Sequence, residues 1–152
     1  MLEFRFIGGE NGYKIAEDMR KKVFADELGM SEYRDELEEL SYHFIGYEKT
    51  MQIGISRLTQ LDENNFNVAF VAVKEDYRRQ FVGDLIMRAL ADKAKSLGGT
   101  AIYIETPVRV KAFFEFEGYE PYGDGFEKDN IPYIRMKKDL TKVQHSCGGC
   151  GK

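Results

Sequence analysis

The stretch "VAVKEDYRRQFVGDLIMRAL", residues 71–90, decides the fold. It closes a near-continuous apolar strand over 66–73, crosses a polar loop and then repeats apolar residues at helical spacing. The apolar positions of this helix are Val82, Leu85, Ile86, Ala89, Leu90 and Leu97. The glycine pair 98–99 ends the helix, and "TAIYIET" (100–106) follows as another strand. This order of strand, helix and strand predicts a parallel crossover within one sheet.

The loop "YRRQFVGD" (77–84) lies where the strand leads into the helix. The first backbone N–H groups of a helix have no partner within it and carry partial positive charge, so they bind phosphate. Residues 79–84 would supply these groups. Such loops are usually rich in glycine, whereas this one has Gly83 alone, with Phe81 two places before it. Phosphate binding stays compatible with Phe81 if its φ is negative, and an ordinary connection between strand and helix stays open from the loop alone.

Periodicity along the rest of the chain predicts one α+β domain with a mixed α/β sheet over residues 1–140, followed by an unpacked tail over 141–152. Ser31 is expected to cap a helix or helical turn in the acidic segment. The expected elements are a strand at 2–7, a helix at 13–28, an acidic helix or helical turn at 31–40, a hairpin of 41–48 and 51–58, a helix at 108–118 and a hairpin of 119–126 and 131–139.

Composition limits the partners. The 152 residues are 43% apolar and carry a net charge of −4, so nucleic acid is not expected as a main partner. No apolar run approaches the roughly 18–20 residues of a membrane span, and the first residues lack the pattern of a signal peptide, so we expect a cytoplasmic protein without a membrane partner. The segment 26–39 holds seven acids and one base. It is either a solvated helix face or an acidic rim that attracts a cationic amine.

Both cysteines lie in the closing stretch "HSCGGC" (145–150), so no disulfide framework is expected and a reducing compartment fits. His145, Cys147 and Cys150 could bind a metal or cycle as a dithiol. A tetrahedral zinc site needs a fourth ligand, and the sequence has none nearby. We therefore expect exposed thiols and no metal site.

Two stretches resemble the GNAT superfamily of acetyl-coenzyme-A-dependent N-acyltransferases, and the likeness covers residues 2–140. In that family a strand leads into a loop of the form Arg/Gln-x-x-Gly-x-Gly/Ala, and here Arg78 matches its first position and Gly83 its last. The stretch "FFEFEGY" (113–119) is similar to the family signature "FYxxxGF". A weaker likeness to the ElaA-like branch rests on Arg20, Val23, Phe24, Glu27 and His43.

The resemblance implies a central sheet of about six or seven strands with flanking helices, and acetyl-CoA as the acetyl donor. It implies that main-chain groups of Val71 and Val73 pair with pantetheine. The implied pyrophosphate loop is Arg78, Arg79, Gln80, Phe81, Val82, Gly83 and Asp84. Asp84 would repel phosphate if its carboxylate faced the loop. The acceptor would be a primary amine of a small molecule or peptide that attacks directly, and a homodimer is common in the family.

The general acid of the resemblance is the tyrosine of "FYxxxGF", and Phe114 stands at that position without a proton to donate. Tyr122 and Tyr133 of the final hairpin are the candidate substitutes, although both fit aromatic packing as well. Without such a substitute, the chain could be a non-catalytic module of this fold that binds CoA or a partner. A third alternative is a thiol- or metal-handling protein that acts through its CGGC tail.

The candidate general base is Glu105, which lies at the C-terminal end of the expected strand 100–106, beside the expected cleft. Glu27 and His43 come next. Glu105 could equally be an ion-pair partner, and His43, alternating with apolar neighbours on a strand, is typical of a packed core histidine.

Overall fold

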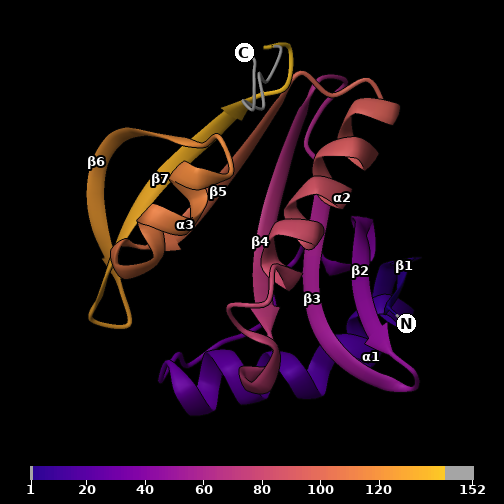
Figure 1. The fold of residues 1–152 in the computed structure, drawn as a ribbon. Coiled ribbons are helices and arrows are strands. Elements are labelled where there is room, and N and C mark those ends of the chain that lie inside the picture. The colour runs from indigo at the N-terminus through magenta and orange to yellow at the C-terminus, as the bar shows by residue number, and fades with distance from the viewer. Residues whose placement is uncertain (1, 143–152) are drawn as a thin grey trace.

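The computed structural model describes residues 2–142, which form a seven-stranded sheet with helices on both faces (Figure 1). The strand order is β1-β2-β3-β4-β5-β7-β6, in which β4 and β5 are parallel and the other neighbours antiparallel. The strands are β1 (Leu2–Gly8), β2 (Ser41–Glu48), β3 (Met51–Gln60), β4 (Asn65–Val73), β5 (Ala101–Pro107), β6 (Glu120–Lys128) and β7 (Ile131–Asp139). This mixed sheet confirms the predicted fold class.

Three α-helices flank the sheet, and no helix within residues 2–142 is long and apolar enough to cross a membrane. The helices are α1 (Gly9–Arg20), α2 (Val82–Ser96) and α3 (Lys111–Phe116). A π-helical segment, η1 (Lys21–Glu27), continues α1 directly. The predicted CGGC tail lies outside the described residues.

The sheet is split between its two parallel strands. β4 and β5 pair only from Asn65↔Ala101 to Val68↔Ile104, and beyond this point they diverge (Figure 1). The rest of β4 therefore has no partner strand on its β5 side. A bulge lies in the same part of β4, because its register with β3 shifts and Phe70 takes a φ of 54°. A bulge of this kind bends a strand and re-aims its groups.

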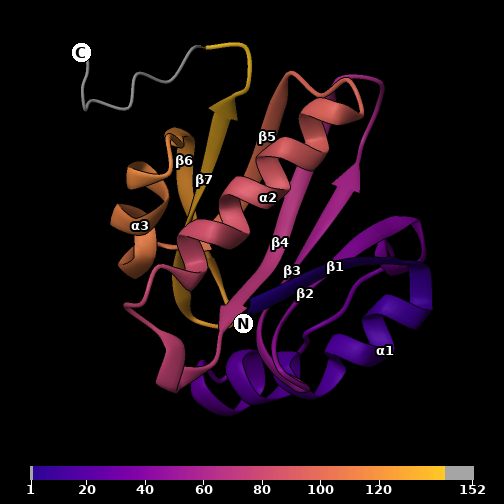
Figure 2. The ribbon, with the colours of Figure 1, turned by 45° about the vertical axis from the view of Figure 1, so that its right-hand side comes forward.

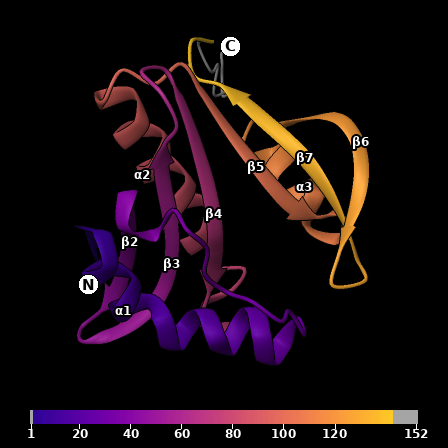
Figure 3. The ribbon, with the colours of Figure 1, turned by 180° about the vertical axis from the view of Figure 1, so that it is seen from behind.

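The two faces of the sheet carry separate apolar clusters. α2 and α3 lie on one face, over the larger core (Figure 2), which includes Phe66, Ile86, Leu90 and Phe114. α1 and η1 lie across the other face (Figure 3), where the smaller cluster is Ala16, Val23, Ile45, Ile55 and Ala72. The split between β4 and β5 thus connects two differently built sides of the molecule.

The acidic segment 31–40, predicted as a helix or helical turn, forms only one helical turn, at its end. It is irregular up to a single 3₁₀ turn, Glu38–Leu40, and Ser31 bonds Asp129 through its N–H and its hydroxyl instead of capping a helix. The Asp35 N–H donates to the Glu38 carboxylate, and such side-chain bonds to the backbone compete with helix formation.

The Glu38 side chain is buried, and its carboxylate neutralises two buried arginines. Arg20 donates to both of its carboxylate oxygens, at 2.7 and 2.9 Å, and Arg57 donates to it at 3.0 Å. All three side chains are at most 1% exposed. Burial acts to raise the pKa of Glu38, but the hydrogen bond and the charge of Arg20 lower it below the ordinary value, so the carboxylate stays ionised.

Candidate active site

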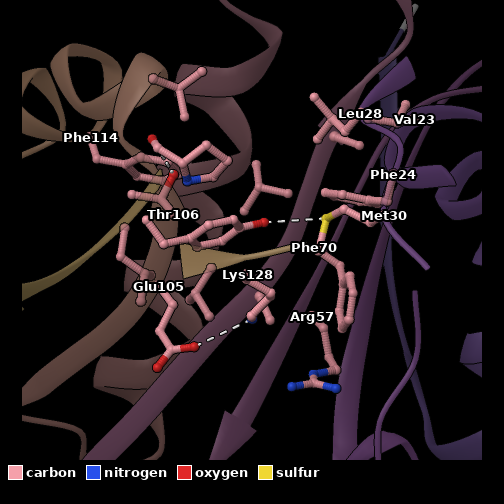
Figure 4. Close-up of a pocket in the computed structure, with 18 of the residues that line it drawn as sticks. Val23, Phe24, Leu28, Met30, Arg57, Phe70, Glu105, Thr106, Phe114 and Lys128 are labelled. Atoms are coloured by element: carbon pink, nitrogen blue, oxygen red, sulfur yellow. Dashed lines mark hydrogen bonds and ion pairs between the residues drawn. The ribbon is translucent and has the colours of Figure 1, made fainter. Parts of the chain in front are cut away.

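A cavity of about 570 Å³ passes through the split of the sheet (Figure 4). Val71 and Val73 of β4 and Phe114 of α3 line it on the α2 side. On the opposite side its wall includes Phe24 of η1 and Met30 of the segment that follows. A substrate on each side of the sheet could therefore reach the same point between the strands.

The N-terminus of α2 lies at the opening of the split on the α2 side. Among residues 2–142, none accepts a hydrogen bond from the backbone N–H groups of residues 79–84, whereas the Leu85 N–H already bonds the Phe81 carbonyl at 3.0 Å. These free donors and the open edge of β4 fit the pyrophosphate and the pantetheine arm of a coenzyme A. The Val82 side chain is buried in the core, so only its backbone is left for a ligand.

The condition of a negative φ at Phe81 is not met. Phe81 has a φ of 64° and lies in the left-handed region, which favours glycine, and Arg79 shares this conformation. Phe81 stands at a glycine position of the loop pattern, so the backbone keeps the glycine conformation although the residue has changed. Its side chain is 75% exposed, so side-chain packing does little to offset the backbone strain.

Gly83 is constrained by the protein itself. A Cβ atom built at this position would lie 3.0 Å from Cε1 and 3.1 Å from Cζ of Phe113. Gly83 therefore lets the start of α2 approach α3 closely. The sequence interpretation attributed crowding at Gly83 to the cofactor, whereas in the structure the Phe113 ring of α3 would also have to shift to admit a side chain.

Asp84 is engaged by side chains of α2 and α3. Its carboxylate accepts a hydrogen bond from Arg88 Nε at 2.9 Å and also faces Glu117. Burial, followed by the hydrogen bond and charge of Asp84, raises the pKa of Glu117 to about 8. Glu117 Oε2 is buried without another partner, which fits a protonated Glu117 that shares its proton with Asp84.

Arg78 turns into the cavity. Its Nη2 donates to both carboxylate oxygens of Glu27, at 2.8 and 3.1 Å, and its Nε donates to the Val73 carbonyl at 2.9 Å. Arg78 thus ties the end of β4 to η1, and Arg79 is a second exposed cation of the loop, without an ion pair among the described residues. The Gln80 side chain donates to the Asp76 carbonyl and stabilises the loop from within.

Tyr133 and Phe114 both line the cavity. The Tyr133 hydroxyl donates to the Met30 thioether at 3.2 Å, a bond drawn as a dashed line in Figure 4. Burial raises the pKa of Tyr133 above its ordinary value, so the hydroxyl keeps its proton at neutral pH. One tyrosine of the final hairpin therefore lines the same cavity as Phe114.

The other two predicted catalytic residues differ in position. Tyr122 packs edge-on against Tyr103 at a centroid distance of 6.0 Å, and it is not among the described residues that line the cavity. Glu105 does line the cavity, and its carboxylate forms long ion pairs with Lys128 at 3.5 Å (Figure 4) and Arg135 at 3.3 Å. Glu105 and Tyr133 thus line the cavity, whereas Tyr122 is outside its described lining.

His43 is a core histidine, as its alternation with apolar neighbours predicts. It is fully buried beside Arg20 and Glu38, and burial is the first cause that lowers its pKa below the ordinary value. It lies apart from the described cavity lining. Residues 2–142 contain no group of three or more side chains able to hold a metal ion, and His145, Cys147 and Cys150 lie outside them.

Sequence reasoning missed several residues of the cavity, and three of them are Arg57, Phe70 and Met30. Arg57 and Phe70 line it from the sheet, and Met30 lines it from the irregular segment after η1. The sequence could have indicated Arg57, because a lone arginine in the apolar strand "MQIGISRL" requires a buried partner. Phe70 and Met30 carried none, because apolar residues are ordinary in a strand and beside a helix.

The split sheet, the free helix N-terminus beside it and the cavity that connects both faces agree with the fold that the resemblance implies. The sequence profile of the acetyltransferase (GNAT) domain family matches residues 12–140, so the chain belongs to this family, whose members transfer acyl groups from acyl-coenzyme A.

Individual relatives agree with this assignment. The uncharacterized N-acetyltransferase YjcF of Bacillus subtilis is 28% identical over 133 residues, which cover 86% of this chain and 94% of YjcF. Escherichia coli ElaA has the same fold, with a TM-score of 0.81 and 18% identity over 91% of this chain and all of that one. An aminoglycoside 6′-N-acetyltransferase complexed with coenzyme A also shares the fold, with a TM-score of 0.71 and 16% identity over 92% of this chain and 99% of that one.

Proposed function

We propose that the chain moves an acetyl group from acetyl-coenzyme A to a primary amine of a small molecule or peptide by direct attack. The observation that carries the proposal is the cavity through the split sheet, because it joins a donor side with free backbone groups to a separate acceptor side. The donor supplies the thioester, and the protein holds the two reactants in line.

On the donor side, the main chain of Val71 and Val73 would hold the pantetheine arm along the open edge of β4. The backbone N–H groups of residues 79–84 would bind the pyrophosphate, with Arg79 as a nearby cation. Arg78 would act through structure, since its ion pair with Glu27 keeps η1 against the cavity.

Tyr133 is the proposed general acid in place of the missing tyrosine at Phe114. The amine nitrogen bonds the thioester carbon, the carbon–sulfur bond breaks, and the leaving thiolate takes the Tyr133 proton. A thioether is a weak acceptor, so the hydroxyl can leave Met30 for a thiolate at little cost. Glu105, on the acceptor side, is the proposed recipient of the amine proton.

The variant Tyr133→Phe tests this assignment, with Tyr122→Phe as a matched control outside the described lining. We expect Tyr133→Phe to lower kcat by about 10²–10⁴-fold and to leave the Kd for acetyl-coenzyme A unchanged in calorimetry. Tyr122→Phe should keep kcat within about twofold, because its hydroxyl lies away from the reaction. An unchanged kcat in Tyr133→Phe, or an equal loss in both variants, contradicts the role of Tyr133.

A further inference from the structure

The acceptor side of the cavity has an apolar wall. Phe24 of η1 and Leu28 and Met30 of the following segment lie together on one side of the cavity (Figure 4). The Phe24 ring packs edge-on against Phe70 at a centroid distance of 5.4 Å, and the Tyr133 hydroxyl bonds Met30. Met30 and Tyr133 are at most 9% exposed, so solvent has little access to the wall where it meets the split. A ligand on this side would gain mainly from burial of apolar surface.

Each carboxylate of the described lining is already ion-paired. Glu27 binds Arg78, Asp35 binds Arg57, and Glu105 lies between Lys128 and Arg135. The acids of segment 26–39 that line the cavity, Glu27 and Asp35, are therefore held by protein cations, and the exposed acids of this segment lie outside the described lining.

The charge of the lining is not negative. Four cationic side chains line the cavity against three carboxylates, and the cations are Arg57, Arg78, Arg109 and Lys128. Nearby positive charge disfavours a bound ammonium and lowers its pKa. This environment favours loss of the proton from the amine that attacks the thioester. A second ammonium that keeps its charge is opposed by it.

We propose that the amine acceptor has an apolar body and a single basic nitrogen, so that polyamines and other polycations are excluded. This inference rests on the proposed function and names the substrate class of the same site. The amine enters with its nitrogen toward the split and its apolar body against Phe24, Leu28 and Met30.

Hexylamine and 1,6-diaminohexane form a matched pair for the test, since they share one chain and differ only in a methyl or an ammonium at the far end. We expect kcat/KM for hexylamine to exceed that for the diamine by about tenfold or more, because the wall has no free carboxylate for the second ammonium. Equal values, or a preference for the diamine or for spermidine, would overturn the inference while leaving acetyl transfer intact.

The variant Leu28→Asp adds a carboxylate to the wall, and Leu28→Asn is its uncharged match. Leu28 is partly exposed, so either residue is compatible with folding. We expect Leu28→Asp to shift the ratio of the two kcat/KM values toward the diamine by about tenfold and Leu28→Asn to leave it nearly unchanged. The same shift in both variants would mean that polarity alone decides, and would contradict the charge argument.

A binding measurement distinguishes a failure of this inference from a failure of the proposed function. Calorimetry measures the Kd of each amine for the protein saturated with coenzyme A, without any turnover. Tighter binding of hexylamine together with no acetylated product would support the acceptor class and refute the transfer. Acetylation that favours the diamine would support the transfer and refute the acceptor class.

Discussion

Replacement of Phe81 by glycine is expected to stabilise the protein. Phe81 has a φ of 64°, and the left-handed region costs a non-glycine residue about 1–2 kcal/mol. Glycine removes this strain but makes the unfolded chain more flexible, which costs about 0.4–1 kcal/mol. The side chain is 75% exposed, so its removal loses little burial. The net gain is about 0.5–1 kcal/mol, or about 1–4 °C in Tm for a chain of this size.

The assay is thermal unfolding followed by circular dichroism, with Phe81→Ala as the control. Alanine also removes the aromatic ring but keeps a Cβ at the same positive φ, so its Tm should stay within about 1 °C of wild type. Acetyl-coenzyme A should bind Phe81→Gly at least as tightly as wild type, because the donors are backbone N–H groups. An equal rise in both variants would assign the effect to the exposed ring, and a fall in Phe81→Gly would refute the strain argument.

Two other substitutions probe the buried charges. Glu38→Gln should destabilise the protein by about 3–5 kcal/mol in urea unfolding, because it leaves Arg20 and Arg57 buried without a carboxylate, and a loss below about 1 kcal/mol would contradict this. Glu117 holds its proton in the folded state up to about pH 8 but loses it in the unfolded chain near its ordinary pKa of 4.5, so stability should fall as pH rises through this window. Glu117→Gln copies the protonated form, so its Tm should match wild type near pH 5 and exceed it at pH 8; parallel Tm curves would refute the raised pKa.

The strands and α2 follow from local patterns. Apolar periodicity and glycine placement predicted all seven strands and the helix after β4 within a few residues, because each pattern reports which side of its own element is buried. The loop 79–84 was predictable as an anion site for the same reason, since its donors belong to the backbone of a helix start. The resemblance through "FFEFEGY" added the family, which the matching profile confirms.

The segment 31–40 shows where local patterns fail. Its pattern predicts a helix or helical turn, and only the 3₁₀ turn Glu38–Leu40 forms. Glu38 instead meets Arg20 and Arg57, which lie 18 and 19 residues away along the chain. Burying those arginines requires a carboxylate, and this long-range demand outweighs helix propensity. The partner of a buried charge is decided by the folded arrangement of the chain.

The sequence by itself determined the sheet, the free N-terminus of α2 and the absence of an acidic hydroxyl at Phe114. Only the tertiary structure decided which tyrosine lines the cavity, and that cations neutralise the acids on the acceptor side. Tyr122 and Tyr133 have similar neighbours in the sequence, so the sequence does not distinguish them. They lie on two paired strands, β6 and β7, and the position of each strand in the sheet decides what each tyrosine contacts. Side chains from distant elements meet only after the sheet splits at Val68, because that divergence creates the space between them.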